Sequence, residues 1–579
     1  MTNDIILNDE QHNVYNNLIK FLQSDENELL LIGYAGTGKT TLITKFINDI
    51  INKKMVRRIA LAAPTHKAVG IIKNKLFGNL SGATNNTNII KYMDILTVHR
   101  LLNYQNYIDN DGNNYFAKSL VDTNWDIYDV IVIDECSMLN NQIINDILIE
   151  IEKNQNKKLK IIYVGDPVQL PPVNQKISKI FNREIKKCYL EKIIRTNNNS
   201  IMDLSNHHRK WILSGNDNDI PRLELYEGDT IIIHENKNVN LWLKNFIDKS
   251  KDNNNKDNNI ILTWTNKKCN LYNDYVRKKI FNKEDLSKYE IGEILIFQDY
   301  HRKKINESNN FIIFYTSEQV KLYDIKESVY KFEKIKSLKN NFLPEELSKL
   351  FSKYIKKLNN IIVDDIKIYE LMVKKINDDN FNLFTENFLK LKKKIEIYNF
   401  KLKKKDISIT DKLKIVELID KNITFVNTLI HKYYESLCQT NIYLDKDELI
   451  KIYSIHTDDE KKYNYIIELG NKILIRLKEK LHKKINNLKN IDNMKKCDIF
   501  SIVEKKMNNL WKDWQMNVID IFAQLNYGYC ITVHKSQGST FKNVFIDIFD
   551  IFENKSKEEV LKCLYTAITR TSDSLELLV

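Results

Sequence analysis

The chain has 579 residues, of which 43% are hydrophobic and 28% charged, and this balance excludes an intrinsically disordered protein. Its length exceeds what a single hydrophobic core usually supports, so more than one domain is expected. The formal net charge of +13 permits binding to a polyanion. Because a lysine-rich composition on solvated faces produces the same excess, charge alone does not decide between these interpretations.

Seven cysteines are spread along the chain, and no two of them are spaced to build a zinc knuckle or a redox motif. The first residues, MTNDIILNDEQ, contain no basic segment that leads into an apolar run. No stretch reaches the ~18 uninterrupted apolar residues that a membrane span needs. We therefore expect a soluble protein of a reducing, intracellular compartment, with no membrane partner.

Short apolar runs bounded by turns or helical patterns are typical of buried parallel strands. An early set comprises Glu28–Gly33, Arg58–Ala63, Asp129–Asp134 and Lys160–Gly165. A later set comprises Thr230–His234, Ile260–Trp264, Tyr529–Val533, Asn543–Ile548 and Ser574–Val579. Together they predict two α/β domains. An Asp-Gly turn between aromatic-bearing arms in Tyr104–Lys118 predicts a β-hairpin that projects from the first domain.

The loop Gly33-Tyr34-Ala35-Gly36-Thr37-Gly38-Lys39-Thr40 follows an apolar run and precedes the helical run Thr41–Ile51. This is the context that a phosphate-binding loop needs. The glycines let backbone N–H groups approach phosphates, Lys39 can neutralise the β and γ oxygens, and the Thr40 hydroxyl can ligate Mg²⁺. The loop therefore predicts binding and hydrolysis of a nucleoside triphosphate with Mg²⁺, and Thr41 is included among the nucleotide-binding residues.

An acidic pair, Asp134 and Glu135, ends the apolar run in DVIVIDECSML. A parallel sheet presents its catalytic groups at the carboxyl ends of its strands. Asp134 can hold Mg²⁺ through water, and Glu135 can activate the attacking water. Alone, such a pair is more often a helix N-cap, but beside a phosphate-binding loop it predicts a hydrolytic site.

The α/β pattern is absent from about Ser317 to Ala523, where the spacing is helical, as in Asn387–Lys405 and Lys472–Leu488. Two β-like runs, Glu293–Phe297 and Phe311–Tyr315, precede it. We expect a mainly helical insertion in the second α/β unit. Its lysine-rich faces suit nucleic acid or a partner protein, although plain solvated helix surface is the simpler interpretation.

An ordered set of segments resembles the motifs of superfamily 1 helicases. These are APTHKAVGII at 63–72, LTVHRLL at 96–102, YVGDPVQLPPV at 163–173, TWTNKKCNLYN at 263–273, ITVHKSQGSTF at 531–541 and LYTAITR at 564–570. The phrases HKSQGST and YTAITR are closest to the RecD/Dda-like branch. The resemblance spans Gln11 to Arg570 but not the helical middle. Relatives carry a smaller β-barrel there. Its first strands resemble the runs GEILIFQDYHRKK and NNFIIFYTSEQVKLYDI.

The resemblance implies an α/β fold with two RecA-like P-loop domains and ATP in the cleft between them. The implied first domain is 1–195, with a hairpin insertion at about 103–118. The second domain is split into 196–290 and 524–579 by an accessory insertion at 291–523 that is partly β and then mainly helical. Related helicases carry a strand-separating pin at the place of the hairpin. Tyr107, Tyr115 or Phe116 would stack on a terminal base pair there, although an ordinary surface loop fits the pattern equally well.

The resemblance also assigns site residues. Gln11 corresponds to an adenine-reading glutamine, and Gln169 to a sensor of the γ-phosphate. Arg195 and Arg570 correspond to two arginine fingers. Gly538 would let the backbone approach the nucleotide. The alternatives are a surface position for Gln11 and a structural ion pair for Arg195.

A single-strand groove is implied across both α/β domains, where polar side chains would contact phosphates. Its residues are Pro64, Thr65, His66, Lys67, Thr97, His99, Thr265, Asn266, Thr532 and His534. For His99 and His534 a structural role remains an alternative.

The implied activity is an ATP-dependent helicase that moves 5′ to 3′ on single-stranded DNA. Single-stranded and forked DNA are the expected partners of a monomeric motor, and the helical insertion would recruit replication or repair proteins. The alternatives are an RNA helicase, a translocase that remodels nucleic acid–protein complexes, or a nucleotide-gated scaffold with a vestigial ATPase.

Overall fold

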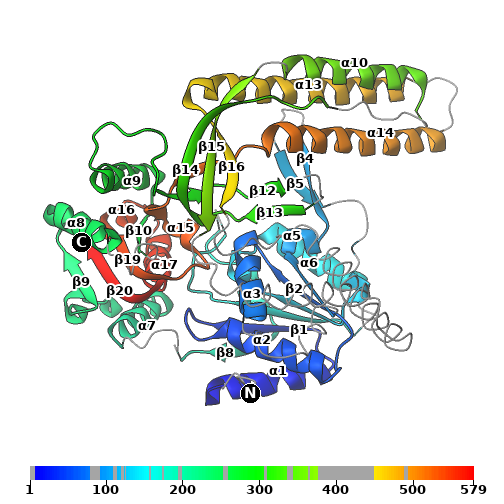
Figure 1. Cartoon of the computed structure of the whole chain (residues 1–579). Helices are drawn as coiled ribbons and strands as arrows, with labels where there is room; N and C mark the ends of the chain where they lie inside the picture. Colours follow the sequence, from blue (N-terminus) through cyan, green and yellow to red (C-terminus); the bar gives the residue numbers. More distant parts are fainter. Residues whose placement is uncertain are drawn as a thin grey trace, which may run out of the picture.

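A computed structural model describes residues 7–78, 92–108, 114–118, 123, 125–154, 158–172, 175–192, 199–251, 259–305, 310–335, 343–362, 365–375, 449–487 and 493–579 (Figure 1). Two parallel sheets lie side by side, and an antiparallel sheet with three long helices lies over them. None of the helices in these ranges combines the length and the apolar character that crossing a membrane requires.

The first parallel sheet has six strands in the order β3-β2-β6-β7-β1-β8. Its strands are β1 (Glu28–Gly33), β2 (Ile59–Ala63), β3 (Met93–Thr97), β6 (Val130–Ile133), β7 (Lys160–Gly165) and β8 (Lys186–Leu190). Its helices are α1 (Asp9–Gln23), α2 (Lys39–Asn52), α3 (His66–Gly78), α5 (Val98–Leu101) and α6 (Asn141–Lys153). Alternate strand residues pack against α1, α2 and α3 on one face and against α5 and α6 on the other.

The four early runs all form strands of this sheet, as predicted, whereas the pattern missed β3 and β8. Both are edge strands with a polar side. In β3, Asp94 is engaged by Arg58 at 2.9 Å and by the Tyr128 hydroxyl at 2.9 Å. β8 begins with two lysines, and only Cys188 and Leu190 of its five residues are buried. Edge strands carry such polar residues because one side meets solvent. The continuous apolar run by which the other strands were predicted is therefore interrupted in β3 and β8.

The second parallel sheet has five strands in the order β18-β10-β19-β20-β9. These are β9 (Ile231–His234), β10 (Asn259–Thr263), β18 (Cys530–Thr532), β19 (Phe541–Asp547) and β20 (Thr571–Leu578), which match the later set of predicted runs. Its helices are α7 (Asn199–Ser214), α8 (Val239–Lys251), α9 (Asn266–Phe281), α15 (Val533–Ser536), α16 (Ile548–Phe552) and α17 (Lys557–Ile568). β10 and β18 pair with each other although the whole accessory insertion separates them in the sequence.

The accessory insertion contains more β structure than its composition indicates. A five-stranded antiparallel sheet has the order β16-β15-β14-β11-β17. Its strands are β11 (Ile294–Phe297), β14 (Gln319–Tyr330), β15 (Ile366–Lys375), β16 (Ile450–Ile455) and β17 (Leu525–Tyr527). A ribbon of β12 (His301–Ile305) and β13 (Asn310–Phe314) shares its core.

β14 begins within the run NNFIIFYTSEQVKLYDI, which resembles the first strands of a β-barrel, but the expectation of a mainly helical segment after about Ser317 is wrong for β15 and β16. Their alternation of isoleucine with lysine is a period of two, which the lysine-rich composition obscured. The run Asn387–Lys405 lies outside the described residues. β17 follows the expected domain boundary at 523 yet pairs with β11, so the accessory sheet takes strands from both sides of it.

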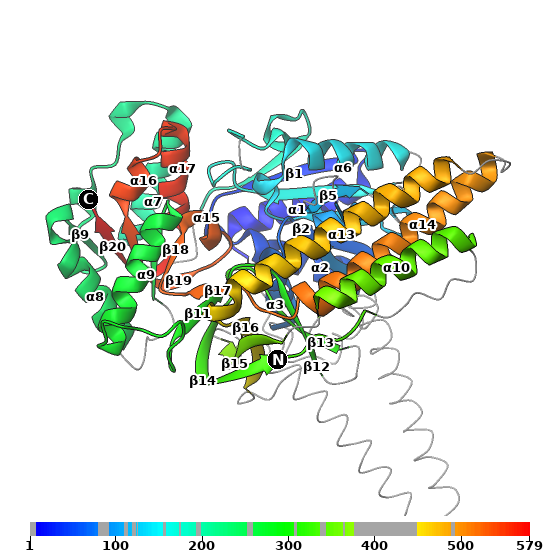
Figure 2. The same cartoon turned by 90° about the horizontal axis from the view of Figure 1, so that it is seen from above.

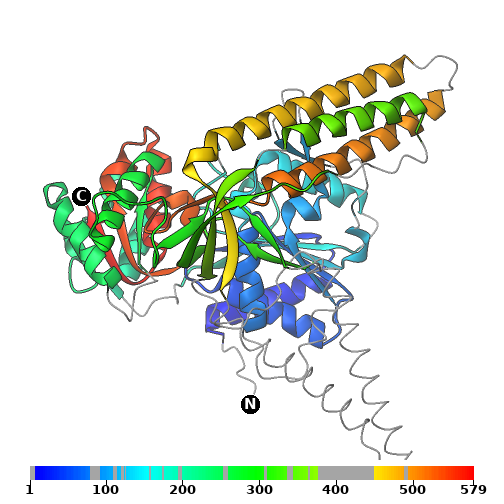
Figure 3. The ribbon, with the colours of Figure 1, turned by 45° about the horizontal axis from the view of Figure 1, so that its top comes forward.

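Three long helices form a further layer, whose core also takes in residues from one end of β15 and β16. They are α10 (Glu345–Ile361), α13 (Glu460–Asn486), which contains most of the predicted run at 472–488, and α14 (Asn493–Trp514). Seen from above, they extend over the first parallel sheet (Figure 2). β4 (Tyr104–Ile108) and β5 (Asn114–Lys118) pair in antiparallel fashion, which confirms the predicted hairpin, while the Asp-Gly turn lies outside the described residues. The two strands lie beneath α14 (Figure 1) and are largely hidden by the helices in Figure 3.

Candidate active site

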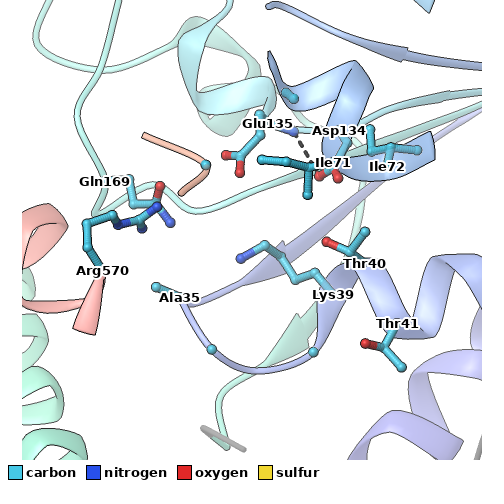
Figure 4. Close-up of a pocket in the computed structure, with 14 residues that line it drawn as sticks. Ala35, Lys39, Thr40, Thr41, Ile71, Ile72, Asp134, Glu135, Gln169 and Arg570 are labelled. Carbon is cyan, nitrogen blue, oxygen red and sulfur yellow. Dashed lines mark hydrogen bonds between the residues drawn. The ribbon is translucent and has the colours of Figure 1, made fainter. Parts of the chain in front are cut away.

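A cavity of about 300 Å³ lies where the two parallel sheets face each other (Figure 4). The first sheet contributes its phosphate-binding loop, the start of α3 and the acidic pair, and the second contributes a glycine and an arginine. The lining residues are Ala35, Gly36, Gly38, Lys39, Thr40, Thr41, Ala68, Ile71, Ile72, Asp134, Glu135, Gln169, Gly538 and Arg570. The structure thus brings together predicted residues that lie more than five hundred positions apart.

The phosphate-binding loop joins β1 to α2. Gly36 and Gly38 have φ values of 81° and 82°, a conformation that favours glycine. A Cβ atom on Gly33 would lie 2.5 Å from the Lys39 side chain, so only glycine fits there. Lys39 Nζ donates to the carbonyl oxygens of Gly33 and Tyr34 at 2.6 and 3.1 Å. The ammonium group is therefore positioned over the loop, where phosphate oxygens can replace these carbonyls.

The acidic pair follows β6. Glu135 has a φ of 52°, in the left-handed region that a non-glycine residue rarely adopts. It precedes a 3₁₀ turn at Cys136–Met138, but its side chain makes no capping hydrogen bond. Glu135 thus holds the N-cap position of this turn without capping it, and its carboxylate points into the cavity (Figure 4). Asp134 Oδ1 accepts a hydrogen bond from the Glu135 backbone N–H at 2.8 Å.

Gln169 lies on the loop after β7 and is held by a buried carboxylate. Its Nε2 donates to Asp166 Oδ2 at 3.2 Å. Asp166 also accepts from the Tyr565 hydroxyl at 3.1 Å, and that hydroxyl accepts from the Ala35 backbone N–H at 3.2 Å. Burial raises the pKa of Asp166, which Lys39 opposes. One network thus joins Gln169, the phosphate-binding loop and helix α17 of the second sheet.

Sequence analysis did not single out Asp166 or Tyr565, although both stand inside quoted motifs, GDPVQ and LYTAITR. The next residue after Gln169, Leu170, reinforces the same junction. It is fully buried in the core of the second sheet, its N–H donates to Thr566 Oγ1 at 3.2 Å, and its carbonyl accepts from Gln537 at 3.3 Å. The loop after β7 therefore anchors the first sheet to the second.

Arg570 forms the opposite wall of the cavity, beside Gln169 (Figure 4). Its side chain is 3% exposed. Nε donates to the Thr566 carbonyl at 3.0 Å, Nη1 to the Ser539 carbonyl at 3.3 Å and Nη2 to Thr569 Oγ1 at 3.1 Å. Neutral oxygens of the second sheet hold the guanidinium, so its charge is not neutralised by these three contacts.

Gln11 and Arg195 are two further residues of the predicted ATP site. Gln11 is only 2% exposed, so the alternative of an ordinary surface glutamine is wrong. Its Nε2 donates to the Thr37 carbonyl at 3.1 Å and its Oε1 accepts from the Asn8 N–H at 3.2 Å, which braces the loop from behind and caps α1. Arg195 lies outside the described residues.

Several hydroxyls of the predicted single-strand groove cap helices. Thr65 accepts from the Ala68 N–H at 3.1 Å, and Thr97 from the Arg100 N–H at 3.2 Å. Thr265 caps α9 and donates to Asp550 at 2.7 Å. Pro64 shares the segment before α3 with Thr65. These contacts place the start of three helices at the same edge of the two sheets, where backbone N–H groups can meet phosphates.

The remaining groove positions link the units to one another. Asn266 and Thr532 line a small hollow against the accessory sheet. Lys67 Nζ donates to the Lys535 carbonyl of the second sheet at 3.3 Å, and burial, with Arg570, lowers its pKa to about 7. Burial also lowers the pKa of both His99 and His534, which favours the neutral imidazole. His66 is exposed.

Two family descriptions match the chain. Residues 17–175 match the family described as an AAA domain, and residues 527–578 match the UvrD-like helicase C-terminal domain. These segments contain the phosphate-binding loop and the acidic pair in the first case, and Tyr565 with Arg570 in the second.

Relatives include an uncharacterized protein of Acanthamoeba polyphaga mimivirus, 28% identical over 99% of this chain and 100% of the relative. The ATP-dependent DNA helicase dda of Enterobacteria phage T4 is 27% identical over 51% of this chain and 61% of its own length. The RecBCD subunit RecD of Buchnera aphidicola is 34% identical over 25% of this chain and 23% of its own length. The chain thus aligns with less than two thirds of either named helicase. A crystal structure of a Bacteroides Pif1 helicase with ADP-AlF3 and single-stranded DNA covers 99% of this chain at 14% identity, with a TM-score of 0.42.

Proposed function

Since this chain is a superfamily 1 helicase of the RecD/Dda-like branch and an ATP-dependent enzyme, we propose that it moves 5′ to 3′ along single-stranded DNA and unwinds forked duplexes. One observation carries this proposal. The cavity that holds the phosphate-binding loop is completed by Gly538 and Arg570 from the side of the other parallel sheet, and the Tyr565 hydroxyl from that side accepts a hydrogen bond from the Ala35 N–H of the loop. Hydrolysis there depends on how the two sheets approach each other, which is the requirement for converting turnover into movement.

For nucleotide binding, we assign the loop Gly33–Thr41 to the phosphates. Lys39 would exchange its loop carbonyls for the β and γ oxygens. The Thr40 hydroxyl and the Asp134 carboxylate are oxygen donors of the kind that Mg²⁺ prefers, and bound Mg²⁺ would offset charge on the β and γ phosphates. Among the described residues no group of three His, Cys, Asp or Glu could hold a metal by itself, which suits an ion shared with a nucleotide.

For the chemical step, Glu135 would accept a proton from the attacking water. Gln169 and Arg570 would contact the transferring phosphoryl group, and Arg195 would be a second arginine finger. Gln11 would read the adenine, and Gly538 would let the backbone approach the nucleotide. We assign the groove residues named above to contacts with the sugar-phosphate backbone of the single-stranded DNA. We also propose domains bounded at 1–195, 196–290, 291–523 and 524–579.

The deciding experiment is unwinding of partial duplexes that carry a 5′ or a 3′ single-stranded tail, in DNA and in RNA, with ATP and Mg²⁺. We expect unwinding of the 5′-tailed DNA duplex by the wild-type chain. Lys39→Ala should abolish it, while Lys45→Ala should not, because Lys45 lies on the same helix but pairs with Asp49 away from the cavity. Unwinding of 3′-tailed DNA would reverse the proposed direction of movement, and a preference for RNA duplexes would make RNA, rather than DNA, the substrate.

A further inference from the structure

Aromatic side chains from the accessory insertion cover the beginning of α3. The Tyr300 ring, between β11 and β12, lies 4.4 Å from the His66 imidazole, centroid to centroid, with 29° between the planes. The Tyr315 ring, just after β13, lies 6.4 Å from each of them. A Cβ atom on Gly70 would lie 2.9 Å from the Tyr315 ring. A stack of rings therefore joins the first parallel sheet to the accessory unit.

The charges of two arginines act on the same ring. Burial raises the pKa of Tyr300 to about 12, and the charges of Arg302 and Arg100 act in the opposite direction, with Asp520 adding to the rise. Arg302 belongs to β12 of the accessory unit and Arg100 to α5 of the first sheet. Rings that can stack with a base, next to guanidinium groups that can meet phosphates, are what proteins use to hold single strands.

The position of the stack connects it to the predicted groove. His66 is exposed and follows Thr65, and Arg100 follows His99 in the next segment of the groove. Lys67, the neighbour of His66, contacts the second sheet at Lys535. The first turn of α3 is thus where both parallel sheets and the accessory unit meet, and we expect single-stranded DNA that crosses from one sheet to the other to pass this point.

We propose that the Tyr300 ring is a base-stacking site for the single strand, on the face that the His66 imidazole now covers, with Arg100 and Arg302 as phosphate partners. This rests on the proposed function. The rings are already at stacking distance, so a base takes the place of the imidazole on the Tyr300 face when His66 changes rotamer. Because every base offers a π face, the site holds any sequence.

The test compares Tyr300→Leu, which keeps apolar volume but has no π face, with Tyr300→Phe, which keeps the ring. The readouts are affinity for an oligodeoxynucleotide that carries 2-aminopurine, the change in its fluorescence on binding, and DNA-free ATPase. We expect Tyr300→Leu to weaken binding roughly five- to 150-fold and to lose part of the fluorescence change, because stacking contributes about 1–3 kcal/mol per base. Tyr300→Phe should behave as wild type.

Tyr323→Leu is the matched control, since this tyrosine is 43% exposed on β14 of the same unit and is expected to change nothing. Arg302→Ala should reduce the slope of log affinity against log salt by about 0.7 for each lost phosphate contact, and Tyr300→Leu should not. Wild-type affinity and fluorescence change in Tyr300→Leu would overturn the stacking site. Wild-type protein that binds no single-stranded DNA would instead overturn the proposed function.

Discussion

At the scale of single residues, the acidic pair shows what geometry adds to a motif. Asp134 and Glu135 follow a strand, a pattern that occurs at many helix starts. In the structure Glu135 adopts a left-handed conformation that costs roughly 1–2 kcal/mol for a residue with a Cβ atom. Its side chain caps nothing and points into the cavity. A strained backbone that places an uncapped carboxylate beside a phosphate-binding loop favours a catalytic role.

Glu135→Gln should therefore leave ATP binding intact while turnover falls by roughly 10²–10⁴, because the amide cannot accept the proton of the attacking water. Binding is measured with a fluorescent ATP analogue and turnover by phosphate release with single-stranded DNA present. Glu152→Gln, an exposed glutamate on α6, is the control. A Glu135→Gln variant that no longer binds nucleotide would show that the residue is structural.

Tyr565 is a second residue whose importance appears only in the fold. Its hydroxyl links the Ala35 N–H of the phosphate-binding loop to Asp166, across the boundary between the two sheets. Tyr565→Phe removes these two hydrogen bonds and keeps the ring. We expect unfolding free energy to fall by about 1–3 kcal/mol, because a buried carboxylate loses a donor. DNA-stimulated turnover should fall more than DNA-free turnover, and an equal fall in both would contradict a role in coupling the sheets.

At the scale of elements, the accessory unit shows how a biased composition hides secondary structure. β15, with the sequence IKIYELMVKK, buries alternate residues between β14 and β16. Isoleucine and lysine also dominate α13, with the sequence EKKYNYIIELGNKILIRLKEKLHKKIN, where the buried residues recur at helical spacing. Short strands and helices drawn from the same residue types differ only in period, and a period of two over a few residues is a weak signal.

The three-helix layer depends on one close approach. A Cβ atom on Gly470 of α13 would lie 2.0 Å from the Trp514 ring, which is fully buried and whose indole N–H donates to Asn471 at 3.2 Å. Gly470→Ala should destabilise the chain by about 1–3 kcal/mol through overpacking, measured by chemical denaturation. Gly228→Ala, which meets nothing within 4 Å, is the control. Equal stability of the two variants would show that Trp514 can move aside.

At the scale of the whole molecule, the positive net charge affects how the protein binds a nucleic acid. With a formal net charge of +13, binding to a nucleic acid should release counterions. We expect ATPase activity to be stimulated by single-stranded DNA, with the concentration needed for half-maximal stimulation rising as salt rises. The measurement is turnover against DNA concentration at several salt concentrations. Stimulation by RNA that equals or exceeds that by DNA would favour an RNA helicase.

The sequence by itself determined the chemistry that lies within short segments. A strand, a glycine-rich turn and a helix are contiguous in Gly33–Thr41 and its flanks, so the residues alone identify a phosphate-binding loop. Asp134 is identifiable in the same way from its place after an apolar strand, whereas Arg570 is assigned only through the resemblance of LYTAITR to a helicase motif. The two parallel sheets were predictable because their inner strands are buried on both faces and are continuously apolar.

The tertiary structure alone decided which distant residues meet. The hydrogen bond from the Ala35 N–H to the Tyr565 hydroxyl, and the stack of Tyr300 on His66, join residues hundreds of positions apart. Such contacts arise from how sheets and helices pack, and no local period or turn signal encodes them. The mixed polar and apolar strands of the accessory unit were decided in the same way, because pairing with neighbours, rather than intrinsic preference, stabilises a strand.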